Sequence, residues 1–248
     1  MSFNQNHAIF LHGWGTNHAV FNDFIPRLVG YHCIAIDLPG YGLLDLKTDF
    51  SPIDIADEIL QTIDKPQHIF GWSLGGFIAL LMAIRQPEKV RSLILCNTFA
   101  RFSASDDYKE GLAINRWQDN VKLFSQNFSG SLKVFFNSQS LGNQDTAQTL
   151  NQLADEIISF RQPEHFVLQS SQQAVINADC RSQLSQITCP VLIFSGAKDK
   201  VTTLAMSEYL HRNIANSEHK VWDKSAHMPF VSEASDCANF VISFWDKV

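Results

Sequence analysis

Residues 70–77, FGWSLGGF, hold a single serine, Ser73, between two closely spaced glycines. A short strand-like run at residues 68–70 precedes this stretch, and the nearly all-apolar residues 77–84 follow it with the character of a buried helix. A G-x-S-x-G sequence between a strand and a helix makes a sharp turn that exposes the serine oxygen. Glycines permit both the strained turn and the close packing of strand against helix. The stretch therefore predicts a nucleophilic Ser73; a small-residue turn without chemistry is the alternative.

The alternation of strand and helix extends along the whole chain. Apolar runs that end in turn residues predict strands at residues 8–11, 33–36, 68–70, 93–96, 191–194 and 220–222. Runs this apolar are typical of parallel strands that are buried on both faces. Helical spacing recurs between them at residues 20–28, 55–63 after a start at 51–52, 77–84 and 238–245. We therefore expect an α/β fold with a doubly wound, mostly parallel sheet.

Residues 100–187 break this rhythm. The segment has few strand-like runs and much Gln, Asn and Ser, and it is too long for a loop. Amphipathic helical stretches are predicted at residues 117–128, 131–136, 150–160 and 164–176. We interpret the segment as a helical cap, or lid, inserted between two strands of a core that residues 1–99 and 188–248 form.

Composition restricts the possible functions. The chain has 248 residues, of which 45% are hydrophobic and 18% charged, as in an ordered globular protein. Its net charge of −6 argues against general binding to nucleic acid or to anionic membranes. The first residues lack the basic and apolar regions of a secretory signal, and no run approaches a membrane span. Five cysteines without a C-x-x-C pair fit a reducing compartment. We expect a cytoplasmic monomer.

A serine nucleophile needs a base, and the base needs an acid that fixes its tautomer. Of the nine histidines, His227 alone follows the last predicted strand in a turn that opens onto the carboxyl edge of the sheet. Asp199 lies in the loop after the preceding strand, whereas the other usual acid position holds the uncharged Asn97. The order Ser73, Asp199, His227 is that of α/β-hydrolases. An ordinary histidine and a solvated loop carboxylate are the alternatives.

The developing oxyanion needs two N–H donors. One is expected from the backbone of Leu74, directly after Ser73 and at a helix start, where the helix dipole favours negative charge. The other is expected from Trp14, in the sequence HGWG after the first predicted strand; a purely structural turn is the alternative there. No nucleotide-binding, Walker A or H-E-x-x-H pattern is present. We therefore infer a hydrolase that uses no metal and no cofactor.

Over essentially the whole chain, these features resemble the α/β-hydrolase superfamily. Within it they are similar to the esterases that act on pimeloyl-acyl-carrier-protein methyl esters in biotin synthesis. The matching landmarks are LHGWG at 11–15, DLPGYG at 37–42, GWSLGG at 71–76 and AHMPF at 226–230. The resemblance implies acyl-carrier protein as the partner that carries the substrate. It also implies substrate contacts from Trp14, Ser73, Leu74 and His227 and, in the cap, from Phe135, Phe136, Asn137, Ser138 and Gln139, for which ordinary cap packing is the alternative.

The chain departs from this family in two places. The family's amino-terminal hairpin is expected to be shortened or absent. The cap arginines that meet the acidic carrier protein are replaced here by Gly130, Val134, Ala147 and Asn151, so a positive patch would have to come from Arg116, Lys122, Lys133 and Arg161. Two alternatives therefore stay open. One is a broad-specificity esterase for short-chain esters or another α/β-hydrolase, and the other is a non-catalytic ligand-binding module on the same fold.

Overall fold

The computed structural model describes residues 6–248. Within them, six strands form one sheet, all parallel, in the order β2-β1-β3-β4-β5-β6. The strands are β1 (Asn6–Leu11), β2 (Tyr31–Ile36), β3 (Gln67–Trp72), β4 (Val90–Cys96), β5 (Val191–Gly196) and β6 (Ser217–Trp222). Each predicted strand is present, and the predicted fold class is confirmed. The shortened hairpin was expected in residues that lie outside the described range.

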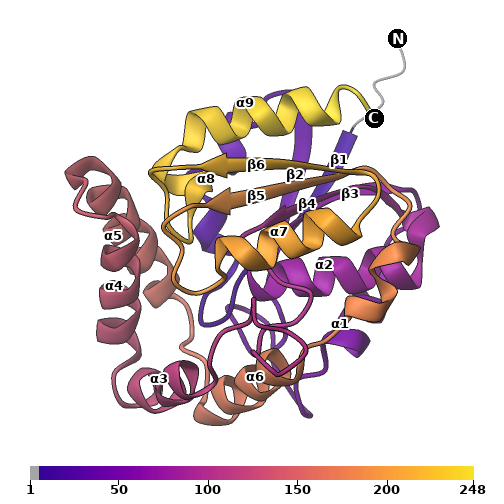
Figure 1. Cartoon of the computed structure of the whole chain (residues 1–248). Helices are drawn as coiled ribbons and strands as arrows, with labels where there is room; N and C mark the ends of the chain where they lie inside the picture. The colour runs from indigo at the N-terminus through magenta and orange to yellow at the C-terminus, as the bar shows by residue number, and fades with distance from the viewer. Residues whose placement is uncertain (1–5) are drawn as a thin grey trace.

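Helices cover both faces of the sheet (Figure 1). Helix α9 (Ala234–Trp245) lies on one face, and α1 (Pro52–Gln61), α2 (Leu74–Arg85) and α7 (Leu204–Asn213) lie on the other. The short helices are the four-residue α8 (Pro229–Ser232) and the 3-10 helices η1 (His18–Phe21), η2 (Ile25–Arg27), η3 (Pro87–Lys89) and η4 (Arg181–Gln186), the last of which ends segment 100–187. Helix α1 begins as predicted, because the Ser51 hydroxyl accepts the Asp54 N–H and Pro52 occupies the first turn.

Two local predictions are wrong. Residues 20–28 form no continuous helix but the two 3-10 turns η1 and η2, because Pro26 lacks the N–H that a continuing helix needs there. The strands β2 and β6 are not buried on both faces, since they are the two edges of the sheet. Ile34 of β2, for example, is 47% exposed.

The described part of the cap segment, residues 100–187, contains four α-helices: α3 (Asn115–Gln126), α4 (Phe128–Gln139), α5 (Gln144–Ser159) and α6 (His165–Asn177). The Asn127 side chain accepts the Gly130 N–H and so begins α4 as a separate helix. The chain leaves the core and returns to it at neighbouring points, where the Cys180 N–H donates to the Ala100 carbonyl over 2.9 Å. The division into core and cap stays a prediction, which this pairing supports.

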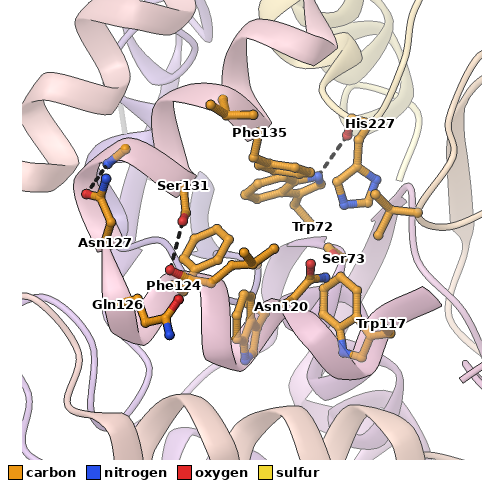
Figure 2. Close-up of a pocket in the computed structure, with 16 residues that line it drawn as sticks. Trp72, Ser73, Trp117, Asn120, Phe124, Gln126, Asn127, Ser131, Phe135 and His227 are labelled. Carbon is orange, nitrogen blue, oxygen red and sulfur yellow. Dashed lines mark hydrogen bonds between the residues drawn. The ribbon is translucent and has the colours of Figure 1, made fainter. Parts of the chain in front are cut away.

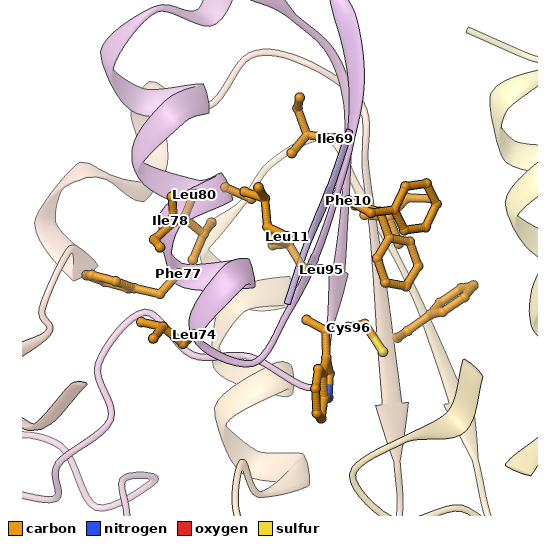
Figure 3. Close-up of a cluster of buried hydrophobic side chains, with 14 of the residues drawn as sticks. Phe10, Leu11, Ile69, Leu74, Phe77, Ile78, Leu80, Leu95 and Cys96 are labelled. Atoms are coloured by element: carbon orange, nitrogen blue, oxygen red, sulfur yellow. The ribbon is translucent and has the colours of Figure 1, made fainter. Parts of the chain in front are cut away.

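The core is built on the central strands. Figure 3 shows Leu11 and Ile69 facing α2, with Phe10 on the opposite face of the sheet. Phe10 stacks on Phe70 there with ring centroids 4.8 Å apart. Helix α2 is buried along almost its whole length, so it holds the turn at Ser73 firmly against the sheet. No helix within residues 6–248 is both long enough and apolar enough to cross a membrane.

Candidate active site

The predicted site residues follow the strands at one edge of the sheet. Trp14 comes after β1, Ser73 after β3, Asp199 after β5 and His227 after β6. Because all six strands run parallel, their carboxyl ends meet at the same edge. The cap helices α3, α4 and α5 lie beyond this edge (Figure 1). The fold therefore brings residues from four distant parts of the sequence under the cap.

Ser73 occupies a strained turn between β3 and α2. Its backbone has φ 55° and ψ −118°, a conformation that costs a non-glycine residue roughly 1–3 kcal/mol. The Ser73 N–H donates to the Cys96 carbonyl over 3.0 Å, and the Thr98 hydroxyl donates to the Ser73 carbonyl over 2.6 Å. A Cβ atom at Gly75 would overlap the Leu11 carbonyl, so only glycine lets α2 approach β1 this closely. The surrounding contacts therefore impose the strain.

Asp199 and His227 form a buried pair. The Asp199 Oδ2 atom lies 2.6 Å from His227 Nδ1 and also accepts the Thr202 hydroxyl over 2.7 Å. The other carboxylate oxygen, Oδ1, accepts the N–H groups of Val201 and Thr202 over 2.7 and 3.2 Å. The carboxylate is thus fully hydrogen-bonded and fixed in orientation. Its bond to Nδ1 leaves His227 Nε2 available as a proton acceptor.

Side chains also hold the main chain around His227. The Trp72 indole N–H donates to the His227 carbonyl over 2.9 Å, and the two rings lie 5.3 Å apart. The Asn97 side chain donates to the Ala226 carbonyl and accepts the Gly196 N–H, over 2.9 and 3.0 Å. Asn97, at the position where some hydrolases carry the acid, therefore connects the last residue of β5 to the loop after β6. The sequence alone did not indicate this role.

Ser73 and His227 line one cavity of about 560 Å³ between the core loops and the cap (Figure 2). Aromatic side chains from both sides form much of its wall: Trp14, Trp72, Trp117, Phe124 and Phe135. Apart from His227, its polar lining groups include amides and hydroxyls, such as Asn120 and Ser131, and no Lys, Arg, Asp or Glu among the described side chains lines it. Within the described residues no hydrogen bond joins the Ser73 hydroxyl to His227. Such catalytic bonds often tighten only when substrate is bound.

The loop after β1 is fixed by a buried histidine that the sequence interpretation did not single out. His12 Nδ1 lies 2.9 Å from the Gly13 carbonyl, and Nε2 accepts the Leu38 N–H over 2.9 Å. Complete burial lowers the pKa of His12 to about 4, in agreement with a ring that both donates and accepts. Trp14 follows, and its indole N–H reaches the Leu168 carbonyl of α6 over 3.3 Å. A neutral His12 thus holds the Gly13–Trp14 turn beside Ser73.

The predicted cap contacts fall into different surroundings. Phe135 lines the cavity and lies 6.2 Å from the His227 ring. Phe136 is fully buried, Asn137 and Ser138 are exposed, and none of the three lines the cavity. Gln139 is buried, and its Oε1 atom accepts the His227 N–H over 3.1 Å. Their role in substrate binding stays a prediction.

Two further observations concern charge. Among residues 6–248, no group of three or more His, Cys, Asp or Glu side chains is arranged to hold a metal ion. Two of the cap cations are paired: Lys133 Nζ lies 2.6 Å from Asp155, and Arg161 Nη1 lies 2.5 Å from Asp45. The Arg116 side chain is outside the part of the chain that the structure describes. Lys122 is exposed and has no ion pair among the described residues.

Comparison with known proteins agrees with this geometry. The profile of the family described as alpha/beta hydrolase fold matches residues 6–234, so the chain belongs to that family. It is 38% identical over 239 residues to a pimeloyl-acyl-carrier-protein methyl ester esterase from Neisseria meningitidis serogroup C, covering 96% of this chain and 93% of the relative. The serogroup B relative of the same name is 40% identical over 90% of this chain and 86% of its own length. The resemblance predicted from the sequence is confirmed.

Solved structures support the fold assignment. An esterase from Exiguobacterium antarcticum matches with a TM-score of 0.85 and 27% identity, over 96% of this chain and 91% of that one. An enol-lactonase from Burkholderia xenovorans matches with a TM-score of 0.80 at 18% identity, over 98% and 92% of the two chains, which shows the shared fold alone. The family, the curated relatives and the esterase structure at 27% identity identify the chain as a carboxylic ester hydrolase.

Proposed function

We propose that this enzyme hydrolyses the methyl ester of a pimeloyl group carried on acyl-carrier protein, releasing methanol and a free carboxylate. The names of relatives at 38–40% identity over most of the chain support this substrate. The observation that best supports the reaction type is that Ser73 and His227 line the same cavity. The described lining carries no Lys, Arg, Asp or Glu, which suits a neutral ester at the end of an acyl chain and disfavours retention of the product carboxylate.

In the proposed reaction the Ser73 hydroxyl attacks the ester carbonyl while His227 Nε2 takes its proton. The protonated imidazole is stabilised by Asp199 through Nδ1, and it then gives the proton to the departing methoxide. An acyl-enzyme on Ser73 remains. A water molecule, deprotonated by His227, attacks this ester, and the proton returns to Ser73 as the acid leaves. The net change is one ester and one water converted to one acid and one methanol.

The proposed oxyanion donors are the backbone N–H groups of Leu74 and Trp14. Leu74 is the first residue of α2, so its N–H has no acceptor within the helix and lies at the positive end of the helix dipole. Trp14 belongs to the turn that His12 fixes, and a Cβ atom at Gly13 would already lie 3.2 Å from the Ser73 side chain. These contacts support two donors converging on an oxygen bound at Ser73.

The proposed role of the cap segment is to enclose the acyl chain and meet the carrier protein. Leu123 and Val134 line the cavity and yet are 53% and 73% exposed, which supports an apolar entrance between α3 and α4. Because Lys133 and Arg161 are paired within the protein, Lys122 is the best-placed cation for an acidic partner. A cytoplasmic location remains part of the proposal, in keeping with cysteines that form no disulfide among the described residues.

The substrate is tested by comparing kcat/KM for the carrier-bound methyl ester with kcat/KM for short nitrophenyl esters. The proposal expects the carrier-bound ester to be preferred by at least about tenfold, which is about 1.4 kcal/mol of transition-state stabilisation. A preference for the free esters by orders of magnitude would support the broad-specificity esterase instead. Restoration of biotin-free growth to cells that lack the known esterase would provide an independent test in vivo.

The non-catalytic alternative is tested separately with a fluorophosphonate that acylates active serine nucleophiles. The proposal expects one label per chain, on Ser73, that is lost in Ser73→Ala. Absence of labelling, with no turnover of any ester, would favour a ligand-binding module.

A further inference from the structure

A glutamine of the cap contacts the backbone of the proposed base. Gln139 is the last residue of α4, and its Oε1 atom accepts the His227 N–H over 3.1 Å. Its Nε2 atom donates to the Phe135 carbonyl over 3.0 Å and to the Ser138 hydroxyl over 2.7 Å. Both amide hydrogens are therefore used within α4. The orientation of the amide is fixed by this network, because the reversed amide would point its oxygen at the Phe135 carbonyl.

In the described structure the His227 N–H donates to Gln139 of the cap, whereas the carbonyls of Ala226 and His227 accept from side chains of the core. Trp72, at the end of β3, holds the His227 carbonyl, and Asn97, directly after β4, holds the Ala226 carbonyl. Among the described cap side chains, Gln139 is the one with a hydrogen bond to this stretch of main chain. His227 lies in a turn outside any strand or helix, so side chains replace the bonds that regular structure would supply. Three side chains from three elements thus fix one short segment.

We infer that Gln139 is a positioning residue for the base, so that the cap segment takes part in setting the direction of the His227 imidazole. The inference rests on the proposed role of His227. Gln139 does not line the cavity, so its effect is exerted through the His227 backbone and not through a bond to substrate. A displacement of about 1 Å in a catalytic group can reduce the rate by about 100-fold. A cap that moves away from the core would leave the His227 N–H unpaired.

A purely structural role for Gln139 predicts different behaviour, and a second cap glutamine serves as the matched control. Gln172 of α6 is also buried, and its Nε2 atom donates to the Trp117 carbonyl over 2.7 Å. This bond holds α6 to α3 and makes no contact with His227. Gln172→Leu therefore removes a buried glutamine from the cap without changing the support of the base.

The charges that face His227 define what a pH profile would report. Asp199 is its ionisable contact in the described structure, while Trp72, Phe135 and Thr202, which also lie against the ring, are neutral. Gln139→Leu removes the acceptor and adds no charge. Gln139→Glu keeps an acceptor for the N–H and adds a negative charge beside the base, which favours the protonated imidazole.

The experiment measures kcat, KM and the pH profile of kcat/KM with a short nitrophenyl ester, together with thermal unfolding, for Gln139→Leu, Gln139→Glu and Gln172→Leu. We expect Gln139→Leu to lower kcat about tenfold, with KM within about twofold, because a buried N–H loses its partner. Gln139→Glu should recover part of this loss above neutral pH and move the acid limb to higher pH. Gln172→Leu should lower the unfolding temperature but leave the acid limb in place.

Three results would overturn the inference: an unchanged kcat in Gln139→Leu, equal losses of kcat and thermal stability in the two leucine variants, or a Gln139→Glu profile without a shifted acid limb. If Gln139→Leu does not fold, the profile of Gln139→Glu decides alone. The short ester keeps this test independent of the carrier protein. A wrong carrier assignment would leave these effects unchanged, whereas failure of the serine mechanism would appear as activity that survives Ser73→Ala.

Discussion

The core loops at the carboxyl edge of the sheet and the cap segment that faces them are stabilised in different ways. In the core, Asp199, His227 and Ser73 are buried and held by short hydrogen bonds from neighbouring loops. In the cap, the ion pair of Lys133 with Asp155 is exposed, and exposed pairs contribute little to stability. Apolar cap side chains at the cavity entrance are exposed as well. The difference indicates that the proposed catalytic groups are held mainly by the core, with Gln139 as a contact from the cap, while the exposed side chains of the cap can vary with the substrate.

The largest effect is expected at the centre of the core. Ser73→Ala should lower kcat by roughly 10⁶-fold for every ester, as removal of a catalytic serine does in other hydrolases. The fold should remain intact, since alanine keeps the Cβ atom and both backbone hydrogen bonds that hold the turn. Steady-state kinetics on carrier-bound and short esters and a circular dichroism spectrum check this. Ser129→Ala, on the cap helix α4, is the control. A loss below about 100-fold would contradict the nucleophile.

The second expected effect concerns acid stability of the core. Because burial lowers the pKa of His12 to about 4 from an ordinary value near 6.5, the unfolded chain binds a proton there that the folded chain does not. Stability from the neutral ring is therefore complete above pH 6.5 and is lost as the pH falls toward 4. The loss amounts to roughly 3 kcal/mol, or about 100-fold in the unfolding equilibrium.

Urea unfolding at pH 7 and at pH 4.5 measures this loss, and His12→Asn should reduce the difference between the two pH values. A nuclear magnetic resonance titration gives a second measurement that does not depend on the variant. A His12 ring that takes up its proton near pH 6.5 in the folded protein would refute the expectation.

The same contrast explains how much the sequence could predict. The strands and the turn at Ser73 follow from local patterns, since apolar runs and closely spaced glycines act over a few residues. Asp199 and His227 could be chosen because parallel strands bring their carboxyl ends to one edge. The support around them could not be predicted. Trp72 and Asn97 reach their partners only after distant parts of the chain have met, and neither residue type signals such a role.

The errors also have physical causes. A helical spacing at residues 20–28 describes which side chains are buried, and Phe21 and Phe24 are indeed buried. It does not describe the backbone, which Pro26 interrupts. In the cap, an apolar pattern gave the helices but not which of their side chains would face the cavity, so Phe135 and Phe136 could not be told apart.

The third effect is expected at Trp72, which directly precedes the proposed nucleophile and contacts the proposed base. Trp72→Phe keeps an aromatic ring in the core but removes the indole N–H that holds the His227 carbonyl. We expect kcat to fall about tenfold for all esters, because a buried carbonyl loses its donor. Trp245→Phe is the matched control, since the buried Trp245 N–H has no hydrogen-bond partner in the described structure. Equal kcat values in the two variants would show that Trp72 only fills space.

The smallest effect is expected at the exposed Lys122 of the cap. A change there should alter the discrimination between substrates and leave the chemical step unchanged. Lys122→Glu should raise KM for the carrier-bound ester by about threefold to fivefold, because one exposed charge at a contact rim contributes little more than that. Short esters carry no acidic partner, so their KM and kcat should stay the same. Lys65→Glu makes the same change in net charge in the turn before β3, at the opposite edge of the sheet, and should affect neither substrate. Higher ionic strength should reduce the Lys122 effect, since exposed charges are screened. Equal losses on both substrates would mean that Lys122 affects the reaction site itself and not only the binding of the carrier protein.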